Sequence, residues 1–139
     1  MSGPKYTVVV CSYFEEKSIE EFLARLILPM REASISFEVV VTNDGSTDET
    51  FSILGELFKL YPEISVVSDL FRNSGQLAAM SCGIANAKGE HFVFIDSDLQ
   101  LDPEQLPELI RVFEQGYDIV SGKRQNREDR LSRKISSIL

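Results

Sequence analysis

The 139-residue sequence has no tryptophan, a single histidine and only two cysteines. Cys11 and Cys82 are too few for a disulfide scaffold or for a zinc cluster built on cysteine. Both stand among apolar or small residues, which indicates reduced, buried thiols in a cytoplasmic protein. The lone His91 has no cysteine or second histidine near it in the sequence, so nothing marks it as a metal ligand.

Long apolar runs are also missing. The longest, residues 6–11 and 92–95, fall far short of the roughly 18 to 20 apolar residues that a membrane-spanning helix needs. The chain does not open on a basic stretch followed by an apolar one, so we expect no signal peptide.

Positive charge is scarce relative to negative charge. Fourteen Lys and Arg face 22 Asp and Glu, for a net charge of −8. This balance argues against general binding of DNA or RNA, which requires a basic face to neutralise phosphates. The hydrophobic fraction of 43% is enough for a core, and no linker or repeat divides the chain, so we expect one domain.

Strand and helix patterns alternate along the chain. Apolar, β-branched or aromatic runs predict strands at residues 6–11, 37–42, 64–68, 91–95 and 118–121. Helical periodicity predicts a helix from Ile19 that ends near Pro29, and a second that Pro62 stops. Ser46 and Glu49 have the spacing of a capping box, and Asp102 with Pro103 predicts the start of another helix. The alternation favours a mainly parallel, doubly wound α/β sheet.

Polar residues follow each predicted strand. In sheets of this kind, ligands bind outside the carboxyl ends of the strands. The segments that meet there are residues 12–15, 43–46, 72–75, 96–98 and 123–124, which together form a partly acidic rim with basic residues on one side. Such a rim suits a nucleoside diphosphate held by a divalent metal.

Asp96 and Asp98 are the candidate metal ligands. They follow a buried strand, and residues i and i+2 of an extended chain project to the same side. A cation between the two carboxylates would relieve their repulsion, and Mg²⁺ or Mn²⁺ prefers such oxygen ligands. Gln100 could add a carbonyl oxygen as a third ligand, or it could contact the carboxylate ligands without binding the ion itself. The alternative is a solvated loop whose acids cap a helix.

Two further strand ends carry candidate ligand contacts. Asp44 could accept hydrogen bonds from a base or a ribose, while Gly45 permits a turn with positive φ; the alternative is an ordinary strand-to-helix turn. Gly75 begins a helix whose N-terminus could favour an anion, and Arg72 could face phosphate or solvent. The small residues after Gly75 indicate close packing of that helix on the sheet.

A basic cluster lies in the last 17 residues of the chain. It could contact a diphosphate, a lipid-linked phosphate or an anionic membrane surface, or it could be a solvated helix face. Its members are Lys123, Arg124, Arg127, Arg130, Arg133 and Lys134.

Four stretches together resemble the family 2 glycosyltransferases of GT-A fold, with the nearest likeness to the dolichol- or undecaprenyl-phosphate sugar transferases. They are VVVCSYFEE, VVVTNDGSTDET, the stretch from RNSGQ to PELI, and GYDIVSGKRQNREDRLSRKISS. The first departs from the family at Phe14, where Asn is usual, and at Cys11, which often is Pro. In the second, Asn43 replaces the first acid of DDGS.

The resemblance implies an inverting, metal-dependent transfer of sugar from a UDP- or GDP-linked donor, with polyprenyl phosphate as the expected acceptor. An acceptor phosphate is already anionic at pH 7, so no strong general base would be needed. Asp96 and Asp98 would be catalytic and would hold Mg²⁺ or Mn²⁺ together with Gln100. The implied donor-binding residues are Ser12, Tyr13, Glu15, Asp44, Asn73, Gly75, Arg124 and Arg127.

Family members continue well beyond the basic stretch, whereas this sequence stops at Leu139 in mid-pattern. We therefore expect residues 1–139 to be the nucleotide-sugar-binding part of a longer protein, without the C-terminal acceptor part. That missing part would supply any membrane contact, at the cytoplasmic face, and the fragment alone could be inactive.

Three alternatives stay open at this point. The chain could be a non-catalytic nucleotide-sugar-binding module, or it could belong to a family 2 transferase that acts on a saccharide. A phosphoryl-transfer domain is less consistent with the sequence, because its acidic pair would follow the first strand, where residues 12–14 contain no Asp. A receiver-like module is excluded for a related reason, since the acidic residues are spread over the ends of two late strands.

Overall fold

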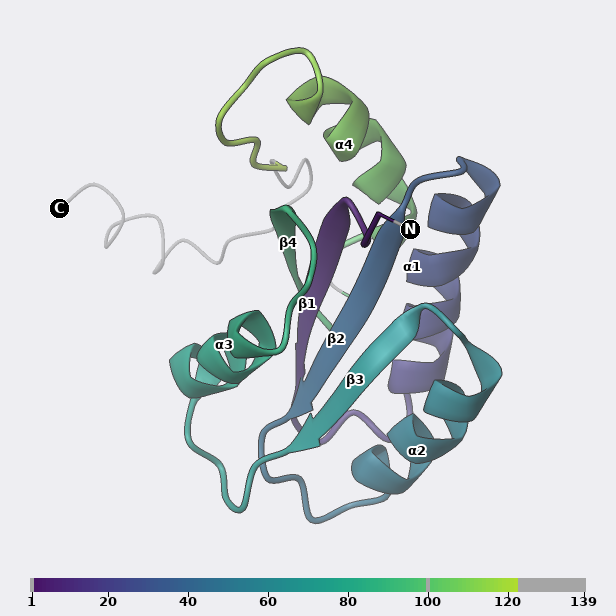
Figure 1. Cartoon of the computed structure of the whole chain (residues 1–139). Helices are drawn as coiled ribbons and strands as arrows, with labels where there is room; N and C mark the ends of the chain where they lie inside the picture. The colour runs from purple at the N-terminus through teal and green to yellow at the C-terminus, as the bar shows by residue number, and fades with distance from the viewer. Residues whose placement is uncertain (1, 100, 123–139) are drawn as a thin grey trace, which may run out of the picture.

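The computed structural model of the chain describes residues 2–99 and 101–122. Its centre is a sheet of four parallel strands in the order β3-β2-β1-β4 (Figure 1). The strands are β1 (Tyr6–Ser12), β2 (Phe37–Asn43), β3 (Ile64–Asp69) and β4 (His91–Asp96). The expected parallel α/β sheet is confirmed, and each of these strands ends one residue later than the sequence pattern indicated.

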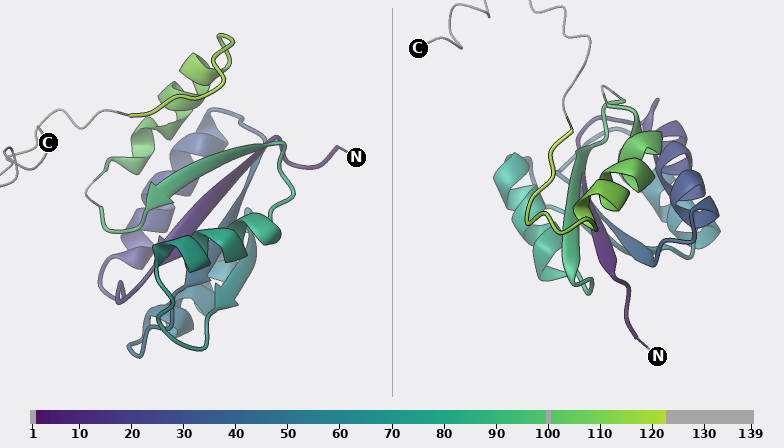
Figure 2. Two further views of the ribbon diagram at one scale, coloured as in Figure 1. Left: turned by 90° about the vertical axis from the view of Figure 1, so that its left-hand side faces the viewer. Right: turned by 90° about the horizontal axis from the view of Figure 1, so that it is seen from above.

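Helices cover both faces of the sheet. The first of them is α1 (Ile19–Glu32), which lies on one face together with α2 (Thr50–Leu60) and α4 (Leu106–Phe113). The opposite face carries α3 (Gln76–Ala85), which packs on β1 and β2 (Figures 1 and 2). A short 3₁₀ helix, η1 (Pro103–Gln105), leads into α4. Since each parallel connection crosses over through a helix, the chain is doubly wound as expected.

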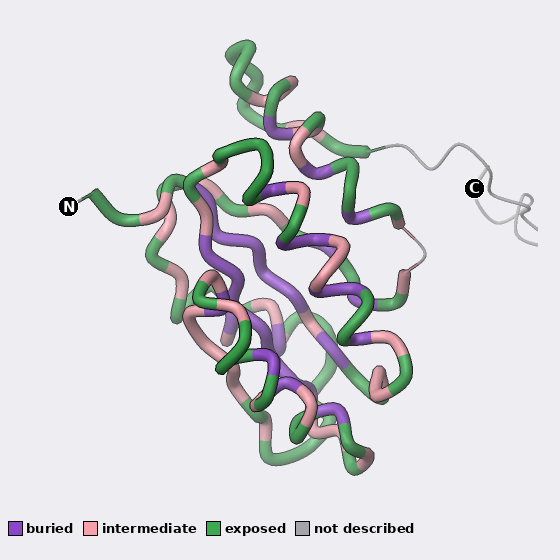
Figure 3. Tube along the Cα trace, turned by 90° about the vertical axis from the view of Figure 1, so that its right-hand side faces the viewer, coloured by how far each residue is buried: buried purple, intermediate pink, exposed green. Residues whose placement is uncertain are grey.

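The main core lies between the sheet and α1. Val8 and Val10 of β1 face Phe22 and Leu26 of α1, and all four side chains are fully buried. The alternate residue Val9 is also buried, beneath α3. Figure 3 shows this buried band running along the central strands. A parallel sheet covered on both faces explains why its strands read as continuous apolar runs.

Two helix boundaries differ from expectation. Helix α1 continues through Pro29 to Glu32, because a proline in the last turn removes only one backbone hydrogen bond. Helix α2 begins at Thr50, so the predicted capping box is wrong. The Ser46 hydroxyl instead donates to Asn43 Oδ1 over 2.6 Å and accepts from the Phe14 amide over 3.0 Å.

The fifth strand, predicted at residues 118–121, is also wrong. The described segment 114–122 contains no strand, and Ile119 is 86% exposed. An apolar, β-branched run becomes a strand only where another strand offers its edge, and in the described part of the chain nothing pairs with this segment. No described helix is both long and apolar enough to cross a bilayer.

Candidate functional site

A pocket of about 330 Å³ opens where β1, β2 and β4 end and α3 begins. It brings together eight of the described residues for which the sequence suggested a ligand role, while Arg72, for which phosphate and solvent were both open, is exposed and does not line it. Besides these, Cys11, Gln76, Ala79 and Ser97 contribute to the wall. The eight are Ser12, Tyr13, Glu15, Asp44, Asn73, Gly75, Asp96 and Asp98.

The acidic pair lies at the end of β4. Asp96 pairs with Cys11 of β1, and the buried Ser97 fixes the turn by donating to the Cys11 carbonyl over 2.9 Å. Gln76 of α3 donates to Asp96 Oδ1 over 2.8 Å. Both carboxylates are exposed at the pocket. A hard divalent ion usually takes one or two protein carboxylates and completes its shell with water and phosphate, so this donor set fits Mg²⁺ or Mn²⁺.

The described residues do not form a closed metal centre. Nowhere in 2–99 or 101–122 do three His, Cys, Asp or Glu side chains converge as ligands. Gln100, the third expected ligand, lies outside the described residues, as do Arg124, Arg127 and the rest of the basic cluster.

Asp44 organises the neighbouring loop. The carboxylate is 5% exposed and accepts from the Ser74 amide at 2.8 Å, the Gly75 amide at 3.0 Å and the Asn73 side chain at 3.1 Å. These bonds hold the loop that leads into α3 against the end of β2. From the sequence, Asp44 is expected either to contact a ligand or to stand in an ordinary strand-to-helix turn, with no role in holding a second loop. Its second role becomes visible only once the two turns are known to be adjacent in space.

Ser12 is the last residue of β1 and is only 2% exposed. Its hydroxyl has no hydrogen-bond partner among the described residues, although it lines the pocket. A buried hydroxyl without a partner costs about 1–3 kcal/mol. A ligand that hydrogen-bonds to Ser12 would recover that cost.

The turn after β1 forms the rim of the pocket. Tyr13 is 44% exposed, and the next residue, Phe14, adopts a φ of 52°. The Glu15 amide donates to the buried Thr50 hydroxyl at 2.9 Å, and the Glu15 carboxylate accepts from Ser18 at 2.5 Å. These bonds direct the turn toward α2 and leave the Tyr13 ring at the opening.

Both cysteines are free, but each is half-buried rather than fully buried as expected. Burial, together with the negative charges of Asp96 and Asp44, raises the pKa of Cys11 to about 11. Cys11 is therefore a neutral thiol at pH 7 in this structure.

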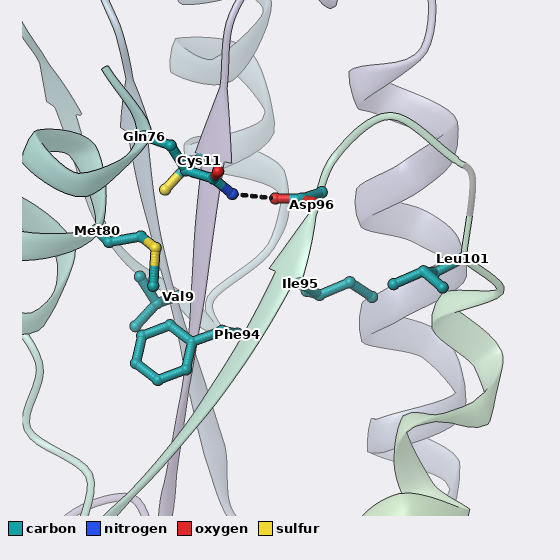
Figure 4. Close-up of a pocket in the computed structure, with 8 residues that line it drawn as sticks. All are labelled: Val9, Cys11, Gln76, Met80, Phe94, Ile95, Asp96 and Leu101. Carbon is teal, nitrogen blue, oxygen red and sulfur yellow. Dashed lines mark hydrogen bonds between the residues drawn. The ribbon is translucent and has the colours of Figure 1, made fainter. Parts of the chain in front are cut away.

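A second, smaller pocket of about 170 Å³ adjoins the first between α3 and β4. It shares Cys11, Gln76 and Asp96 with the larger pocket and is otherwise apolar. Met80 and Phe94 face each other across it (Figure 4).

Solved structures share this architecture. PcManGT, a mannosyltransferase from Pyrobaculum calidifontis in complex with GDP-Man and Mn²⁺, superposes with a TM-score of 0.64 at 27% identity, over 80% of this chain and 32% of its own. S. aureus TarS 1-349 in complex with UDP-GlcNAc superposes with a TM-score of 0.59 at 32% identity, over 80% of this chain and 31% of its own. The GT-A fold expected from the sequence is confirmed.

Curated relatives match nearly the whole chain. An undecaprenyl-phosphate 4-deoxy-4-formamido-L-arabinose transferase of Photorhabdus laumondii is 36% identical over 134 residues, which are 96% of this chain and 41% of that protein. The Pseudomonas fluorescens protein of the same name is 37% identical over 133 residues, which are 96% of this chain and 39% of that protein. The chain thus spans about 40% of the length of these relatives. Because residues 7–138 match the family model for glycosyl transferase family 2, the chain belongs to that family.

Proposed function

We propose that residues 1–139 bind a nucleotide-sugar donor and form the donor half of an inverting glycosyltransferase that acts on a polyprenyl phosphate. One observation carries the proposal: eight residues that follow or end separate strands, chosen from the sequence for ligand chemistry, line a single pocket. The names of the relatives support the undecaprenyl-phosphate acceptor, and UDP-GlcNAc and GDP-Man in the similar structures support the donor class.

The pocket is suited to a diphosphate. The Gly75 amide at the N-terminus of the ten-residue helix α3 already donates to Asp44, but the following amides of the first turn have no partner within the helix, and together with the helix dipole they favour an anion. Ser12 would hydrogen-bond to the donor, and the Tyr13 ring would border the nucleoside. Asp44 Oδ1 accepts one hydrogen bond among the described residues, from the Ser74 amide, and its second lone pair retains capacity for a base or ribose donor.

Asp96 and Asp98, with Gln100 from outside the described residues, would hold Mg²⁺ or Mn²⁺; the Mn²⁺ in PcManGT supports this assignment. The ion would neutralise charge that develops on the departing diphosphate. Gln76 would keep the Asp96 carboxylate directed at the pocket. Arg124 and Arg127 would add positive charge beside the phosphates. The acceptor phosphate would attack in line without a general base, which inverts the anomeric configuration.

A binding experiment tests the donor assignment. Melting temperatures are measured with UDP-, GDP- and dTDP-sugars, each with and without Mn²⁺, because a ligand that binds only the folded state raises the melting temperature. We expect a metal-dependent rise for at least one donor, and loss of the metal dependence in Asp98→Asn. Asp118→Asn, an exposed acid away from the pocket, is the matched control. If the melting temperature of the wild type is the same with every donor as without one, the proposal is refuted.

Turnover tests the acceptor assignment. Labelled donor is incubated with undecaprenyl phosphate in detergent, with a soluble oligosaccharide in a parallel arm. Transfer to the lipid phosphate is the expected result for the full-length protein. Donor binding without transfer by residues 1–139 would identify this part as a donor-binding module, and transfer to the oligosaccharide would contradict the lipid acceptor.

A further inference from the structure

Asn43 is the last residue of β2 and is completely buried. Its side-chain NH₂ group donates to Asp69 Oδ1 at the end of β3 over 2.8 Å. Its side-chain oxygen accepts from the Ser46 hydroxyl over 2.6 Å. One amide side chain therefore connects the end of β3 to the turn after β2.

The chain of hydrogen bonds continues to the rim of the pocket. Ser46 Oγ, oriented by Asn43, accepts from the backbone amide of Phe14 over 3.0 Å. Phe14 has a φ of 52°, a left-handed conformation that costs a bulky residue free energy and persists only where the surroundings impose it. The residue before it is Tyr13, which lines the pocket.

We propose that Asn43 is a positioning residue for nucleotide binding, acting through Ser46 and Phe14 to hold Tyr13 at the pocket, with Asp69 fixing the orientation of its amide. This inference rests on the proposed donor site. It also explains why Asn replaces an acid at position 43: a carboxylate there would lie at hydrogen-bond distance from the Asp69 carboxylate, and like charges that close repel.

The relay is tested first at Ser46, which is half-buried. Ser46→Ala should speed hydrogen exchange of the Phe14 amide and weaken binding of UDP or GDP with Mn²⁺ by roughly tenfold, the effect of losing one hydrogen bond. Ser46→Thr retains a hydroxyl and should restore both, and Thr47→Ala, at the exposed neighbouring residue, should change neither. Unchanged exchange and affinity in Ser46→Ala would overturn the inference.

Exchanging the amide and the carboxylate between positions 43 and 69 tests the role of Asn43 itself. Asn43→Asp should weaken nucleotide binding at a temperature where the variant is folded, and Asn43→Asp with Asp69→Asn should recover wild-type affinity because the hydrogen bond re-forms with its polarity reversed. Failure of the folded double variant to recover would contradict the assignment. If wild-type protein binds no nucleotide, the proposed function fails, while the Phe14 exchange rate in Ser46→Ala still decides whether the relay exists.

Discussion

Gly45 lies so close to the backbone of Arg72 that a Cβ atom on it would stand 2.3 Å from the Arg72 carbonyl carbon. Gly45 also has a φ of 71°, in the left-handed region. The turn after β2 and the loop after β3 therefore pack backbone against backbone, which brings Asp44 within reach of Asn73 and Gly75. Glycine is required here by both space and conformation.

Gly45→Ala should destabilise the protein by about 2–6 kcal/mol, since the positive φ and the displaced loop each cost about 1–3 kcal/mol. The shifted loop should also lose nucleotide affinity. Urea unfolding and calorimetry measure the two effects.

The matched control is Gly55→Ala in the middle of α2, where no atom lies within 4 Å of the added methyl group. This change should stabilise the protein by about 0.5–1 kcal/mol, because alanine is the better helix former. Equal stabilities of the two variants would contradict the packing described for Gly45.

Phe14 offers a test of backbone strain. Its φ of 52° is a conformation that asparagine adopts more readily than other non-glycine residues, and Asn is the residue usual at this position in the family that the sequence resembles. Because any substitution loses the ring contact with Tyr13, Phe14→Ala is the proper reference. Phe14→Asn should be more stable than Phe14→Ala by about 0.5–1 kcal/mol in urea unfolding. Equal midpoints would mean that the turn is not strained.

Much of this arrangement could be predicted from the sequence. The apolar runs of β1, β2, β3 and β4 identify the buried strands, and a parallel sheet then places their carboxyl ends together. That reasoning was enough to choose Ser12, Asp44 and Asp96 as neighbours, although they are far apart in the chain.

Contacts between turns could not be predicted in the same way. The S-x-x-E spacing at Ser46 predicted a helix cap, but the hydroxyl bonds instead to Asn43, at the end of the preceding strand, and to Phe14, which comes from the turn after β1. The run at residues 118–121 has strand composition, yet strand formation depends on a partner edge that local sequence does not specify. Local patterns describe propensity, whereas these outcomes depend on which segments become neighbours.

The opposite end of the sheet carries a buried carboxylate. Glu38 Oε1 accepts from the Thr7 hydroxyl over 2.7 Å and from the Lys88 amide over 2.6 Å. Burial alone would raise the pKa of Glu38, but the hydrogen bonds outweigh it and the pKa lies below its usual value. The folded state therefore gains stability from ionised Glu38 above the unfolded-state pKa of about 4.3, and loses it as the pH falls through the lower folded-state value.

Glu38→Gln should remove this contribution. The variant should be less stable than wild type at pH 7, and the difference should shrink as the pH is lowered below about 4. Urea unfolding at a series of pH values measures it, with Glu90→Gln, an exposed acid, as the control. A difference that stays constant from pH 7 to pH 3 would show that ionised Glu38 is not favoured by the fold.

Helix α3 packs closely on the sheet because residue 83 is a glycine and has no side chain. A Cβ atom on Gly83 would stand 2.6 Å from Val9 Cγ1, so Gly83→Ala should push α3 away from β1 and cost about 1–3 kcal/mol despite its better helix propensity. Val9→Ala should cost about 2 kcal/mol by leaving a cavity. Combined, the two changes should cost clearly less than their sum, since the new methyl group occupies the space that Val9 leaves. Additive costs in a double-mutant cycle would mean that Gly83 and Val9 do not share this space. Because α3 also carries Gly75 and Gln76 to the pocket, nucleotide affinity should fall in Gly83→Ala and return in the double variant.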